Sequence, residues 1–599
     1  MGSCSETARG GKVRFAGAVA IAAAVALAAA FPDIAGAAHP PSAIGTREAA
    51  STDHEAATRV AMDLMEAGGN AVDGAIGAAL ALGVVNPDAS GIGGGGFALV
   101  YTAKDRLVTA LDFRETAPAK FSADVLWPER KPVPGEPAKP WWEFTGEPNG
   151  GVVGVPGEPA GLEVLSRRFG RKSLSDAAAP AVALARKGFD VGLYTAAQVR
   201  KARDRVEASP SLASVFLPGG NPIGFGTRVR RPVLATTLER YGREGKRAIY
   251  EGATAEKIAG AVTAAGGTMT TEDLARYEVE ERAPLTRTID ERTVVTMPAP
   301  SAGGLMLLEV LQMYGASSKS ELAELSQGSS AYIHMLAEAM RGAYADRARI
   351  ASDPDVVAGV DAVYERALDP RSIAARRATI DPDRTRAPVE FETAARLHEL
   401  RTRGKGTTHL VVADRDGNVV SLTTTINGPF GASIIPEGTG ILLNNELEDF
   451  THPNEAKVFG FTDGGPNRPR PRARPVSSMT PALVFEDGRP ILATGGSGGM
   501  RIATSVTQAT VARLVFGRDP NACVSAPRFH TQGIDLFVDP HIPLDVREGL
   551  VRRGETVKEE PSMISAVQMI AWGPLVGHAP HLHLLAASDP RKVGAAAAR

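Results

Sequence analysis

Apolar positions recur at helical spacing through much of the chain up to about residue 400. Thr52-x-x-Glu55 resembles a capping box and predicts the start of one helix, and an alanine-rich segment predicts a second helix over residues 71–85. An apolar strand over residues 97–101 follows a glycine-rich turn, and helical spacing returns over residues 331–349. This part of the chain is therefore predicted to be mainly helical.

The pattern changes to strands after Thr407. Residues 408–413 and 419–425 are predicted to pair around Asp416-Gly417, because glycine can take the left-handed conformation that a tight hairpin turn needs. A three-residue loop would place a threonine, Thr425, directly opposite Thr407, and a two-residue loop would displace it by one position. In either register the two hydroxyl groups are predicted to be neighbours across the hairpin.

Thr407 has the chemistry of a nucleophile if the peptide bond before it is cut. A threonine hydroxyl needs a base within hydrogen-bond reach, and a free α-amino group on the same residue is such a base. Gly406 leaves the carbonyl of that bond open to attack. The sequence therefore predicts a precursor that cleaves itself between Gly406 and Thr407. His409 is predicted on the face of Thr407, either as a general base or, as we expect, as a packed histidine.

Ser497, in a Gly-x-Ser-x-Gly motif, is a second candidate nucleophile. The predicted strand over residues 491–494 and the helix over residues 502–516 give this motif the setting of a nucleophile elbow. An elbow needs an acid and a histidine later in the chain, and the spacing singles out none of the later histidines. The alternative is that Gly498 and Gly499 present backbone N–H groups to a substrate oxyanion.

Charged and hydroxyl residues elsewhere could together bind an amino acid. Arg114 is a cation, Glu446 and Asp449 are carboxylates three positions apart, and Ser477 and Ser478 are two small donors. Singly, each is more typical of a solvated charge or a turn. Together, the anions could hold an α-amino group, and the cation and hydroxyls an α-carboxylate.

Two further motifs point to ligands only weakly. A Gly-x-Gly-x-x-Gly match begins at Gly91, but the dinucleotide fingerprint needs a strand before it and a helix after it, and here that order is reversed. His578-x-x-His581-x-His583 has a spacing that could bind a metal, but no carboxylate or cysteine completes a known ligand set. Neither a nucleotide nor a metal site is predicted.

Composition and charge are those of a folded protein without an electrostatic preference for nucleic acid. The 599 residues are 43% hydrophobic and 22% charged, with 66 basic and 68 acidic residues, and this length favours roughly two to four domains. Prolines interrupt the basic run from Arg468 to Arg474, which is predicted to be a solvated loop. Cys523 is predicted to be a buried structural thiol, and Cys4 leaves with the N-terminal segment described next, so no internal disulfide is expected.

Residues 1–37 have the three parts of a secretory signal. Basic residues precede an unbroken apolar run over residues 15–31, and Ala35-Gly36-Ala37 offers a cleavage site. An uncleaved membrane anchor is the alternative, but the run is alanine-rich and short for a bilayer span of about 20 residues. The protein is therefore expected to be exported to the bacterial periplasm or exterior, without a stable membrane anchor.

These residues belong to a longer set of motifs, and through them the chain resembles the γ-glutamyltranspeptidases, exported members of the N-terminal-nucleophile hydrolase superfamily. The resemblance covers nearly all of the chain after residue 37. Its most specific parts are Thr407-Thr408-His409, Leu443-Asn444-Asn445-Glu446, Ser477-Ser478-Met479 and Gly498-Gly499; further parts are Gly68-Gly69-Asn70-Ala71-Val72-Asp73, Gly93-Gly94-Gly95-Gly96-Phe97, Asp112-Phe113-Arg114-Glu115, Gly154-Val155-Pro156-Gly157 and Pro300-Ser301-Ala302-Gly303-Gly304.

The resemblance implies roles in a two-stage reaction. Thr407 would attack the carbonyl of Gly406, then the γ-glutamyl amide of glutathione or a related peptide, with Thr425 supporting it by hydrogen bonding. Gly498 and Gly499 would hold the oxyanion. Water, or an amino acid or dipeptide, would take the acyl group, and no cofactor or metal is implied. The implied binding residues are Arg114, Ser477 and Ser478 for the α-carboxylate, and Asn427, Glu446 and Asp449 for the α-amino group.

The resemblance also implies the fold and the organisation of the chain. The fold is expected to be α+β, a four-layer αββα sandwich of the N-terminal-nucleophile hydrolase type that both processed subunits form jointly. The expected parts are a signal peptide (1–37), a large subunit (38–406) and a small catalytic subunit (407–599) that stay together as a heterodimer.

Two departures from the family and two other functions enter the prediction. Ser497 stands where many relatives carry proline, and Phe459 lacks the hydroxyl of the lid tyrosine found in many bacterial relatives. The alternatives are a glutaryl or cephalosporin acylase of the same fold and a serine esterase that uses Ser497. Arg114, with the carboxylate pair of Glu446 and Asp449, favours an amino-acid head group, since a glutaryl chain has no amine to be held.

Overall fold

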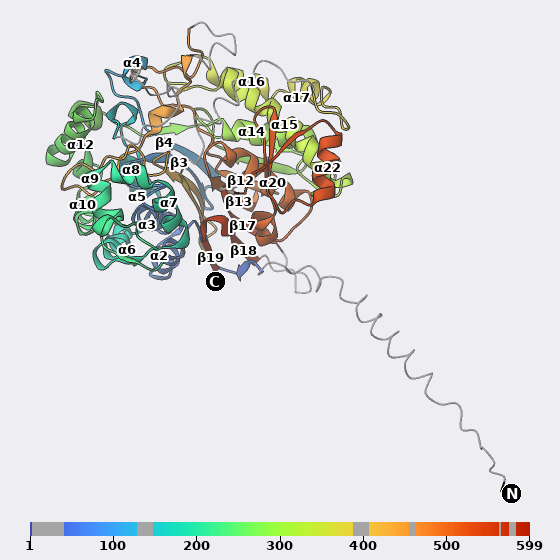
Figure 1. The fold of residues 1–599 in the computed structure, drawn as a ribbon, viewed down its shortest axis with the longest axis horizontal. Coiled ribbons are helices and arrows are strands. Elements are labelled where there is room, and N and C mark those ends of the chain that lie inside the picture. The colour runs from blue at the N-terminus through green and yellow to red at the C-terminus, as the bar shows by residue number, and fades with distance from the viewer. Residues whose placement is uncertain (3–40, 128–147, 387–405, 454–462, 562–564, 574–582) are drawn as a thin grey trace. The chain divides into compact units, whose positions relative to one another are not determined.

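Two seven-stranded antiparallel sheets form the centre of the computed structural model of this chain (Figure 1). Sheet I has the order β19 (Ala595–Ala598), β2 (Ala49–Thr52), β10 (Thr408–Ala413), β11 (Val419–Thr425), β3 (Gly95–Thr102), β4 (Leu107–Phe113) and β7 (Glu280–Arg282). Sheet II has the order β1 (Ala43–Gly45), β18 (His583–Ser588), β17 (Ala566–Gly573), β13 (Arg489–Ser497), β12 (Ala482–Glu486), β9 (Arg292–Thr296) and β8 (Leu285–Ile289).

The described part of the chain has several gaps, and Ser42–Arg599 folds as one unit. Residues 3–37 of the predicted signal peptide, Phe459 at the position compared with the lid tyrosine, and His578 and His581 fall outside the described residues. No helix in the described ranges combines the length and the apolar character that crossing a bilayer requires. The described residues are 1–2, 41–127, 148–386, 406–453, 463–561, 565–573 and 583–599.

Helices cover the outer face of each sheet. On sheet I lie α2 (Glu55–Glu66), α3 (Ala71–Val85) and α5 (Glu158–Phe169), while α6 (Leu174–Lys187) packs on α3, and α10 (Pro232–Glu244) packs on α6. On sheet II lie α14 (Gly303–Tyr314) and α20 (Arg501–Leu514), while α15 (Ser330–Ile350) and α17 (Pro370–Arg377) pack on α14. The sheets face each other, with β10 and β11 against β13. Together these four layers are the predicted αββα sandwich.

Further helices and strands lie outside these layers. The helices are α4 (Ala123–Leu126), α7 (Leu193–Lys201), α8 (Arg203–Glu207), α9 (Pro210–Phe216), α11 (Arg247–Tyr250), α12 (Gly252–Ala264), α13 (Thr271–Ala275), α16 (Val360–Ala367), α21 (Pro520–Ser525) and α22 (Leu544–Arg552). The strands outside the two large sheets are β5 (Phe189–Asp190), β6 (Arg228–Val229), β14 (Phe529–His530), β15 (Asp535–Val538) and β16 (Thr556–Glu559).

Both sheets draw strands from the two sides of Thr407. In sheet I, β10, β11 and β19 follow this residue and the other four strands precede it; in sheet II, β1, β8 and β9 precede it and the other four follow. The sandwich is therefore built jointly by the residues before and after the predicted cleavage point.

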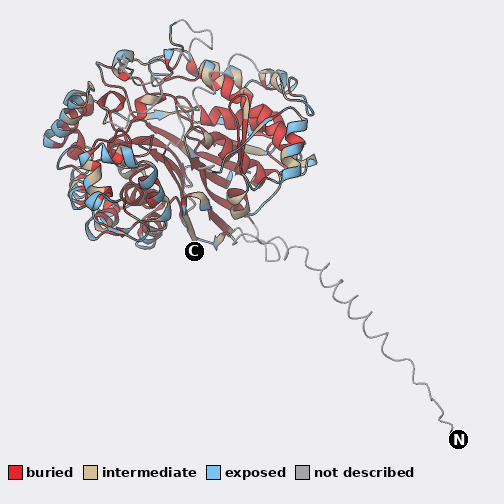
Figure 2. Cartoon of the chain, in the orientation of Figure 1, coloured by how far each residue is buried: buried red, intermediate tan, exposed pale blue. Residues whose placement is uncertain are grey.

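Strand β10 is buried on both faces, so its residues divide between two cores. Leu410 and Val412 pack in the core between sheet I and its helices, whereas Val411 and Ala413 pack in the core shared by the two sheets and the helices of sheet II. Because side chains alternate along a strand, Thr407 belongs with the positions that face sheet II. Figure 2 shows buried residues along both sheets and exposed residues on the outward sides of the covering helices.

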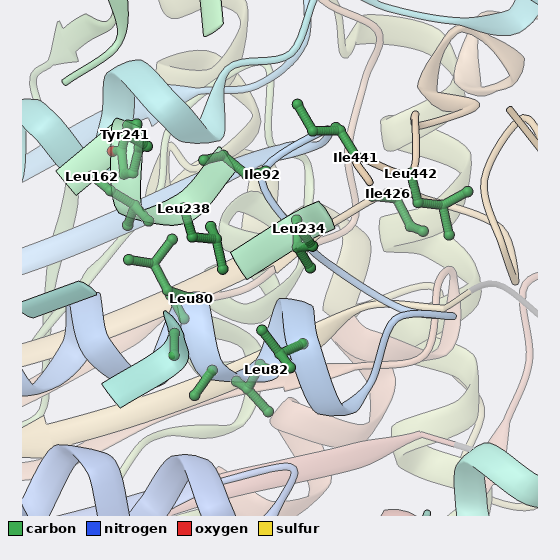
Figure 3. Close-up of a cluster of buried hydrophobic side chains, with 14 of the residues drawn as sticks. Leu80, Leu82, Ile92, Leu162, Leu234, Leu238, Tyr241, Ile426, Ile441 and Leu442 are labelled. Atoms are coloured by element: carbon green, nitrogen blue, oxygen red, sulfur yellow. The ribbon is translucent and has the colours of Figure 1, made fainter. Parts of the chain in front are cut away.

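Helix α3 has the predicted bounds and is packed on nearly all sides. Asn70 caps it by accepting hydrogen bonds from the N–H groups of Val72 and Asp73, and the Asp73 carboxylate accepts from the N–H of Asn70. Its small residues allow close approach, since a Cβ atom at Gly77 would lie 2.2 Å from Leu64 Cδ1 of α2. Figure 3 shows leucines of α3 in an apolar cluster that extends to Ile426 and Leu442, beside the site described below.

Several local predictions differ from the structure. Helix α2 begins at Glu55, but its cap is His54, whose Nδ1 accepts from the N–H of Ala56, because Thr52 ends strand β2. The hairpin of β8 and β9 was missed within a stretch predicted to be mostly helical. Arg474 is buried against acidic residues, Asp353 and Asp355 among them, so the prediction of a solvated loop is wrong at this position.

Candidate active site

The hairpin of β10 and β11 has the three-residue loop that was one of the two predicted alternatives. Thr408 pairs with Thr424, and the N–H of Asp414 donates to the carbonyl of Asn418, which leaves residues 415–417 as the loop. Gly417 has a φ of 85°, the left-handed conformation that the prediction required. This register continues to Thr407, which lies opposite Thr425 with the two Oγ1 atoms 3.1 Å apart.

The peptide bond before Thr407 lies against both threonine hydroxyl groups. Thr407 Oγ1 forms a hydrogen bond with the carbonyl oxygen of Gly406, and Thr425 Oγ1 donates to the same oxygen at 3.3 Å. A Cβ atom at position 406 would lie 2.8 Å from the carbonyl oxygen of Asp88 and 2.9 Å from Ala89 Cα. Glycine is therefore required by packing, and it also leaves the carbonyl group open to attack.

The glycine run of residues 93–96 brings β3 close to the hairpin. A Cβ atom at Gly94 would lie 1.9 Å from the carbonyl oxygen of Thr425, and one at Gly96 would lie 2.1 Å from that of Thr423. The run follows a helix and precedes a strand, which is the reverse of a dinucleotide-binding unit. These glycines serve the packing of sheet I.

Asn427 connects the hairpin to the next candidate residues. Its backbone has a φ of 71°, and its N–H donates to Thr425 Oγ1 at 2.8 Å. Asparagine tolerates this left-handed conformation better than most residues. Its side-chain Nδ2 donates to the carbonyl of Asn445 at 3.0 Å, directly before Glu446. Asn427 thus lies between the nucleophile candidate and the predicted carboxylates.

Arg114 is buried and binds both predicted carboxylates. Its Nη1 donates to Glu446 Oε1 at 2.5 Å and its Nη2 to Asp449 Oδ2 at 2.8 Å. Its Nε donates to the carbonyl of Pro475 at 2.6 Å, and Nη2 also donates to the carbonyl of Val476 at 3.1 Å. The sequence predicted the cation and the anions as separate halves of a binding site, whereas the structure joins them directly.

Two buried carboxyl groups beside Arg114, those of Glu446 and Glu115, have oxygen atoms without a hydrogen-bond partner among the described residues. Among the described residues, neither Glu446 Oε2 nor either carboxylate oxygen of Glu115 has a hydrogen-bond partner. Burial, and then the charge of Glu446, raise the pKa of Glu115 well above its ordinary value, although Arg114 opposes the shift. Burial and the neighbouring charge both favour the protonated form of Glu115. It was quoted in a motif but not predicted to be a site residue.

The predicted serines, Ser477 and Ser478, lie between the backbone that binds Arg114 and the predicted oxyanion turn. Ser477 follows Val476, and its Oγ accepts from the N–H of Met479 at 3.1 Å. Ser478 Oγ donates to Met500 Sδ at 3.3 Å, and Met500 directly follows the two glycines of the turn. Gly498 and Gly499 have φ values of 129° and 63°, and they precede the first residue of α20. Conformations of this kind are open mainly to glycine.

Ser497 lacks the partners of a nucleophile elbow. It is the last residue of β13, and its buried hydroxyl donates to Asp53 Oδ2 at 2.9 Å. His530 Nδ1 bonds to Thr504 at 3.0 Å, and no histidine bonds to Asp53 or Ser497 through its ring within the described ranges. The residues that the structure describes therefore do not assemble a Ser-His-acid triad around Ser497.

His409 is a packed histidine on the face of Thr407, as expected. Its Nδ1 lies 2.8 Å from Thr423 Oγ1, and its Nε2 lies 3.3 Å from Ser421 Oγ. A Cβ atom at Gly495 of β13 would lie 2.3 Å from the ring, so the histidine fills the space between the sheets. Burial lowers the pKa of His409 to about 3, and the ring is therefore neutral.

A buried lysine near the C-terminus reaches Thr407, and no sequence motif predicted this contact. Lys592 Nζ donates to the carbonyl oxygen of Thr407 at 2.5 Å and lies 3.6 Å from Asp53 Oδ2. Burial raises the pKa of Asp53 above its ordinary value, although Lys592 and hydrogen bonds from Ser497, Gln568 and the His409 N–H oppose the shift. No spacing pattern connects these residues, which lie at opposite ends of the chain.

One group of residues has ligand atoms close enough together for a metal. Atoms of His334, Glu338 and Glu555 lie within 4.8 Å of one another. Arg341 forms ion pairs with both carboxylates, each at 2.5 Å. The group is therefore an ion-pair cluster in which an arginine occupies the place of a cation.

Comparisons with known proteins identify the family to which the chain is similar. The sequence profile described as Gamma-glutamyltranspeptidase matches residues 57–599. The glutathione hydrolase proenzyme of Escherichia coli (strain K12) is 34% identical over 541 residues, which cover 90% of this chain and 89% of that protein. The proenzyme of the same description from Bacillus subtilis (strain 168) is 33% identical over 540 residues, 88% of each chain.

A solved structure confirms the fold over nearly the whole chain. The crystal structure of cephalosporin acylase from Bacillus halodurans superposes with a TM-score of 0.78 at 25% sequence identity, and the match covers 94% of this chain and 97% of that one. The predicted family and the predicted N-terminal-nucleophile sandwich are both confirmed.

Proposed function

Because the chain belongs to the γ-glutamyltranspeptidase family, an enzyme family, we propose that it is a γ-glutamyltransferase and glutathione hydrolase with Thr407 as its nucleophile. One observation carries the assignment of Thr407. Its Oγ1 contacts the carbonyl oxygen of Gly406 and also lies 3.1 Å from Thr425 Oγ1. A threonine placed in this way can cut the peptide bond before it and then use the freed amine as its base.

The first step is cleavage between Gly406 and Thr407. The Thr407 hydroxyl oxygen attacks the carbonyl carbon, the C–N bond breaks, and the hydroxyl proton passes to the leaving nitrogen, which leaves an ester between the two residues. Thr425 donates to the carbonyl oxygen at 3.3 Å and stabilises the charge that develops on it. Water hydrolyses the ester, giving a large subunit that ends at Gly406 and a small subunit that begins with Thr407.

In turnover, the α-amine of Thr407 takes the proton of its own hydroxyl while the oxygen attacks the γ-carbonyl carbon of a γ-glutamyl amide. The N–H groups of Gly498 and Gly499 donate to the oxyanion, and loss of one such donor typically costs about 10²–10³ in kcat. The amide C–N bond then breaks, and the leaving amine takes the proton. Water, an amino acid or a dipeptide accepts the glutamyl group from the Thr407 ester.

The charges around Arg114 favour a substrate head group that carries both signs. Arg114 contributes one positive charge against two negative charges from Glu446 and Asp449. An α-amino acid brings an ammonium group for the carboxylates and a carboxylate for Arg114, Ser477 and Ser478, so each charge keeps a partner. This balance supports glutathione and other γ-glutamyl compounds as substrates.

A glutaryl or cephalosporin acylase is the second candidate, supported by the likeness to the Bacillus halodurans acylase at a TM-score of 0.78. A glutaryl group has a carboxylate but no amine. It would therefore add a third negative charge beside Glu446 and Asp449 without a compensating cation, which disfavours its binding.

Export and subunit assembly are also part of this proposal. Residues 1–37 would direct the precursor out of the bacterial cytoplasm and be removed. The two subunits would remain together, because each sheet contains strands from both sides of Thr407.

The test is an assay of the purified full chain with a γ-glutamyl anilide, with and without glycylglycine, beside a glutaryl anilide and a simple ester. We expect release of aniline from the γ-glutamyl compound, acceleration by the dipeptide if transfer competes with hydrolysis, and a smaller polypeptide that begins Thr-Thr-His. Full activity in a single uncut chain, or preference for the ester, would contradict the proposal.

A further inference from the structure

Asp53 is a buried carboxylate on which donors from three separate parts of the chain converge. Ser497 Oγ donates to its Oδ2 at 2.9 Å, and Gln568 Nε2 donates to its Oδ1 at 2.6 Å. The N–H of His409 donates to Oδ2 at 3.3 Å, and Lys592 Nζ lies 3.6 Å from the same oxygen. These partners favour the ionised form of Asp53 and oppose the effect of burial, and the carboxyl group joins residues from separate segments of the chain.

Lys592 connects this carboxyl group to the nucleophile. It lies in the short helix η6 (Pro590–Lys592), between β18 of sheet II and β19 of sheet I. Its side chain is fully buried, its ammonium group lies 5.3 Å from the centre of the Tyr194 ring, and Nζ donates to the Thr407 carbonyl. The nearby carboxylate of Asp88 adds a second negative charge. These contacts hold the ammonium group at one place behind Thr407.

We propose that Asp53, Ser497 and Lys592 are positioning residues that fix Thr407 relative to the oxyanion turn of Gly498 and Gly499. Lys592 holds the main chain of Thr407, Asp53 holds Lys592 and Ser497, and Ser497 immediately precedes the turn. This inference rests on the proposed function of Thr407, and it gives Ser497 a role other than that of a nucleophile.

The architecture explains why such a connection is needed. Thr407 precedes β10 of sheet I, whereas Gly498 and Gly499 follow β13 of sheet II, so the nucleophile and the oxyanion donors belong to different sheets. Apolar packing between sheets is non-directional and sets no exact distance. Hydrogen bonds and ion pairs are directional, and a displacement of about 1 Å at a reacting group can cost roughly 10²-fold in rate.

The principal test replaces the ion pair without leaving an unpaired charge. The variant Lys592→Met/Asp53→Asn removes both charges together, which limits the loss of stability that a single buried charge would cause. We expect kcat for a γ-glutamyl anilide to fall about 30-fold or more with KM within about twofold, and cleavage at Gly406–Thr407 to slow by a similar factor. Folding is checked by thermal unfolding against the uncut precursor of Thr407→Ala.

Ser497 supplies a matched pair of variants. Ser497→Ala removes the hydroxyl and is expected to lower kcat about three- to tenfold, whereas Ser497→Thr keeps the hydroxyl and is expected to restore kcat to within about twofold of the wild type. A serine nucleophile would instead lose nearly all turnover in the alanine variant.

Arg341→Met is the control for loss of a buried cation far from Thr407 along the chain, and it should lower the unfolding temperature without changing kcat or self-cleavage of the folded protein. The inference is overturned if the folded double variant cleaves itself and turns over within about twofold of the wild type, or if it behaves like Arg341→Met. If the wild type cuts itself but does not turn over γ-glutamyl compounds, the proposed function fails, and the rate of self-cleavage in the variants still decides the inference.

Discussion

Two buried arginines in this protein each bind two carboxylates, and their clusters differ in how completely the acceptors are filled. Arg341 pairs with Glu338 and Glu555, both at 2.5 Å. The second oxygen of Glu338 receives Arg386 Nε at 2.5 Å, and the second oxygen of Glu555 lies 2.8 Å from His334 Nδ1. Every carboxylate oxygen of this cluster therefore has a donor.

The Arg114 cluster is less complete. Arg114 pairs with Glu446 and Asp449, but Glu446 Oε2 has no donor among the described residues, and Glu115 beside it is buried without a hydrogen-bond partner there. A cluster in which every acceptor has a donor can stabilise the fold by itself. A buried acceptor without a donor lowers the stability of the fold unless a bound ligand donates to it. An arginine paired with two carboxylates can therefore either stabilise the fold or form part of a ligand-binding site.

The largest effect is expected from removal of the nucleophile, which leaves both clusters intact. Thr407→Ala should give an uncut precursor with activity lower by about 10⁴-fold or more, because neither the hydroxyl nor the new amine exists. Gel electrophoresis, N-terminal sequencing and a γ-glutamyl anilide assay check this. Efficient splitting of the variant would contradict self-cleavage by this hydroxyl.

The next effect separates the two clusters by function. Arg114→Met should lower kcat/KM for γ-glutamyl substrates by about 10³-fold, equivalent to about 4 kcal/mol, because the substrate carboxylate loses its cation and two anions remain. Arg114→Lys should recover only part of this loss, since a lysine cannot replace the bidentate geometry. Steady-state kinetics on both variants measure the effect, and unchanged kinetics in Arg114→Met would remove this residue from the site.

The filled cluster should respond in stability and not in catalysis. Arg341→Met leaves two buried carboxylates facing each other, and we expect it to lower the free energy of unfolding by about 3 kcal/mol. Urea denaturation measures the loss, and KM and kcat of the folded fraction serve as the control. A change in KM comparable to that of Arg114→Met would show that the two clusters are not functionally distinct.

The smallest expected effect is a pH dependence of the filled cluster. Burial alone would lower the pKa of His334, but hydrogen bonds to Glu555 and to the Asp381 carbonyl raise it above its ordinary value. A raised pKa means that His334 contributes stability below its unfolded pKa of about 6.5, and that this contribution is lost as pH rises through the folded pKa. The unfolding temperature of the wild type should therefore fall as pH rises through the folded pKa of His334. In His334→Asn the unfolding temperature should depend less on pH in that range.

Sequence reasoning succeeded where the signals are local. The hairpin of residues 408–425 depends on strand residues beside a turn with glycine, and its register places Thr425 opposite Thr407 as one of the two alternatives required. Helix α3 likewise carries its own cap, since Asn70 and Asp73 lie within one turn. Such elements are encoded by residues that are close in sequence.

Contacts between distant residues could not be predicted in the same way. Lys592 and Thr407 are 185 positions apart, and Asp53 and Ser497 are 444 positions apart, so no spacing rule connects them. The burial of Arg474 could not be predicted either, because its carboxylate partners Asp353 and Asp355 are 121 and 119 positions away in the sequence. The β8–β9 hairpin was not predicted, because its turn, with Asp290 at a φ of 55°, contains no glycine or proline.

The position of the proposed cleavage has a consequence for the order of folding and maturation. Chain ends normally lie at the surface, but Thr407 is only 3% exposed and leads into a strand with neighbours on both sides. If the chain is cut at this bond as proposed, the precursor would have to fold before the bond breaks. After the cut, β2 and β3 would no longer be covalently joined to β10 and β11, so a denatured mature molecule would have to refold from two separate chains. We therefore expect the uncut precursor to refold after denaturation more readily than the cleaved protein.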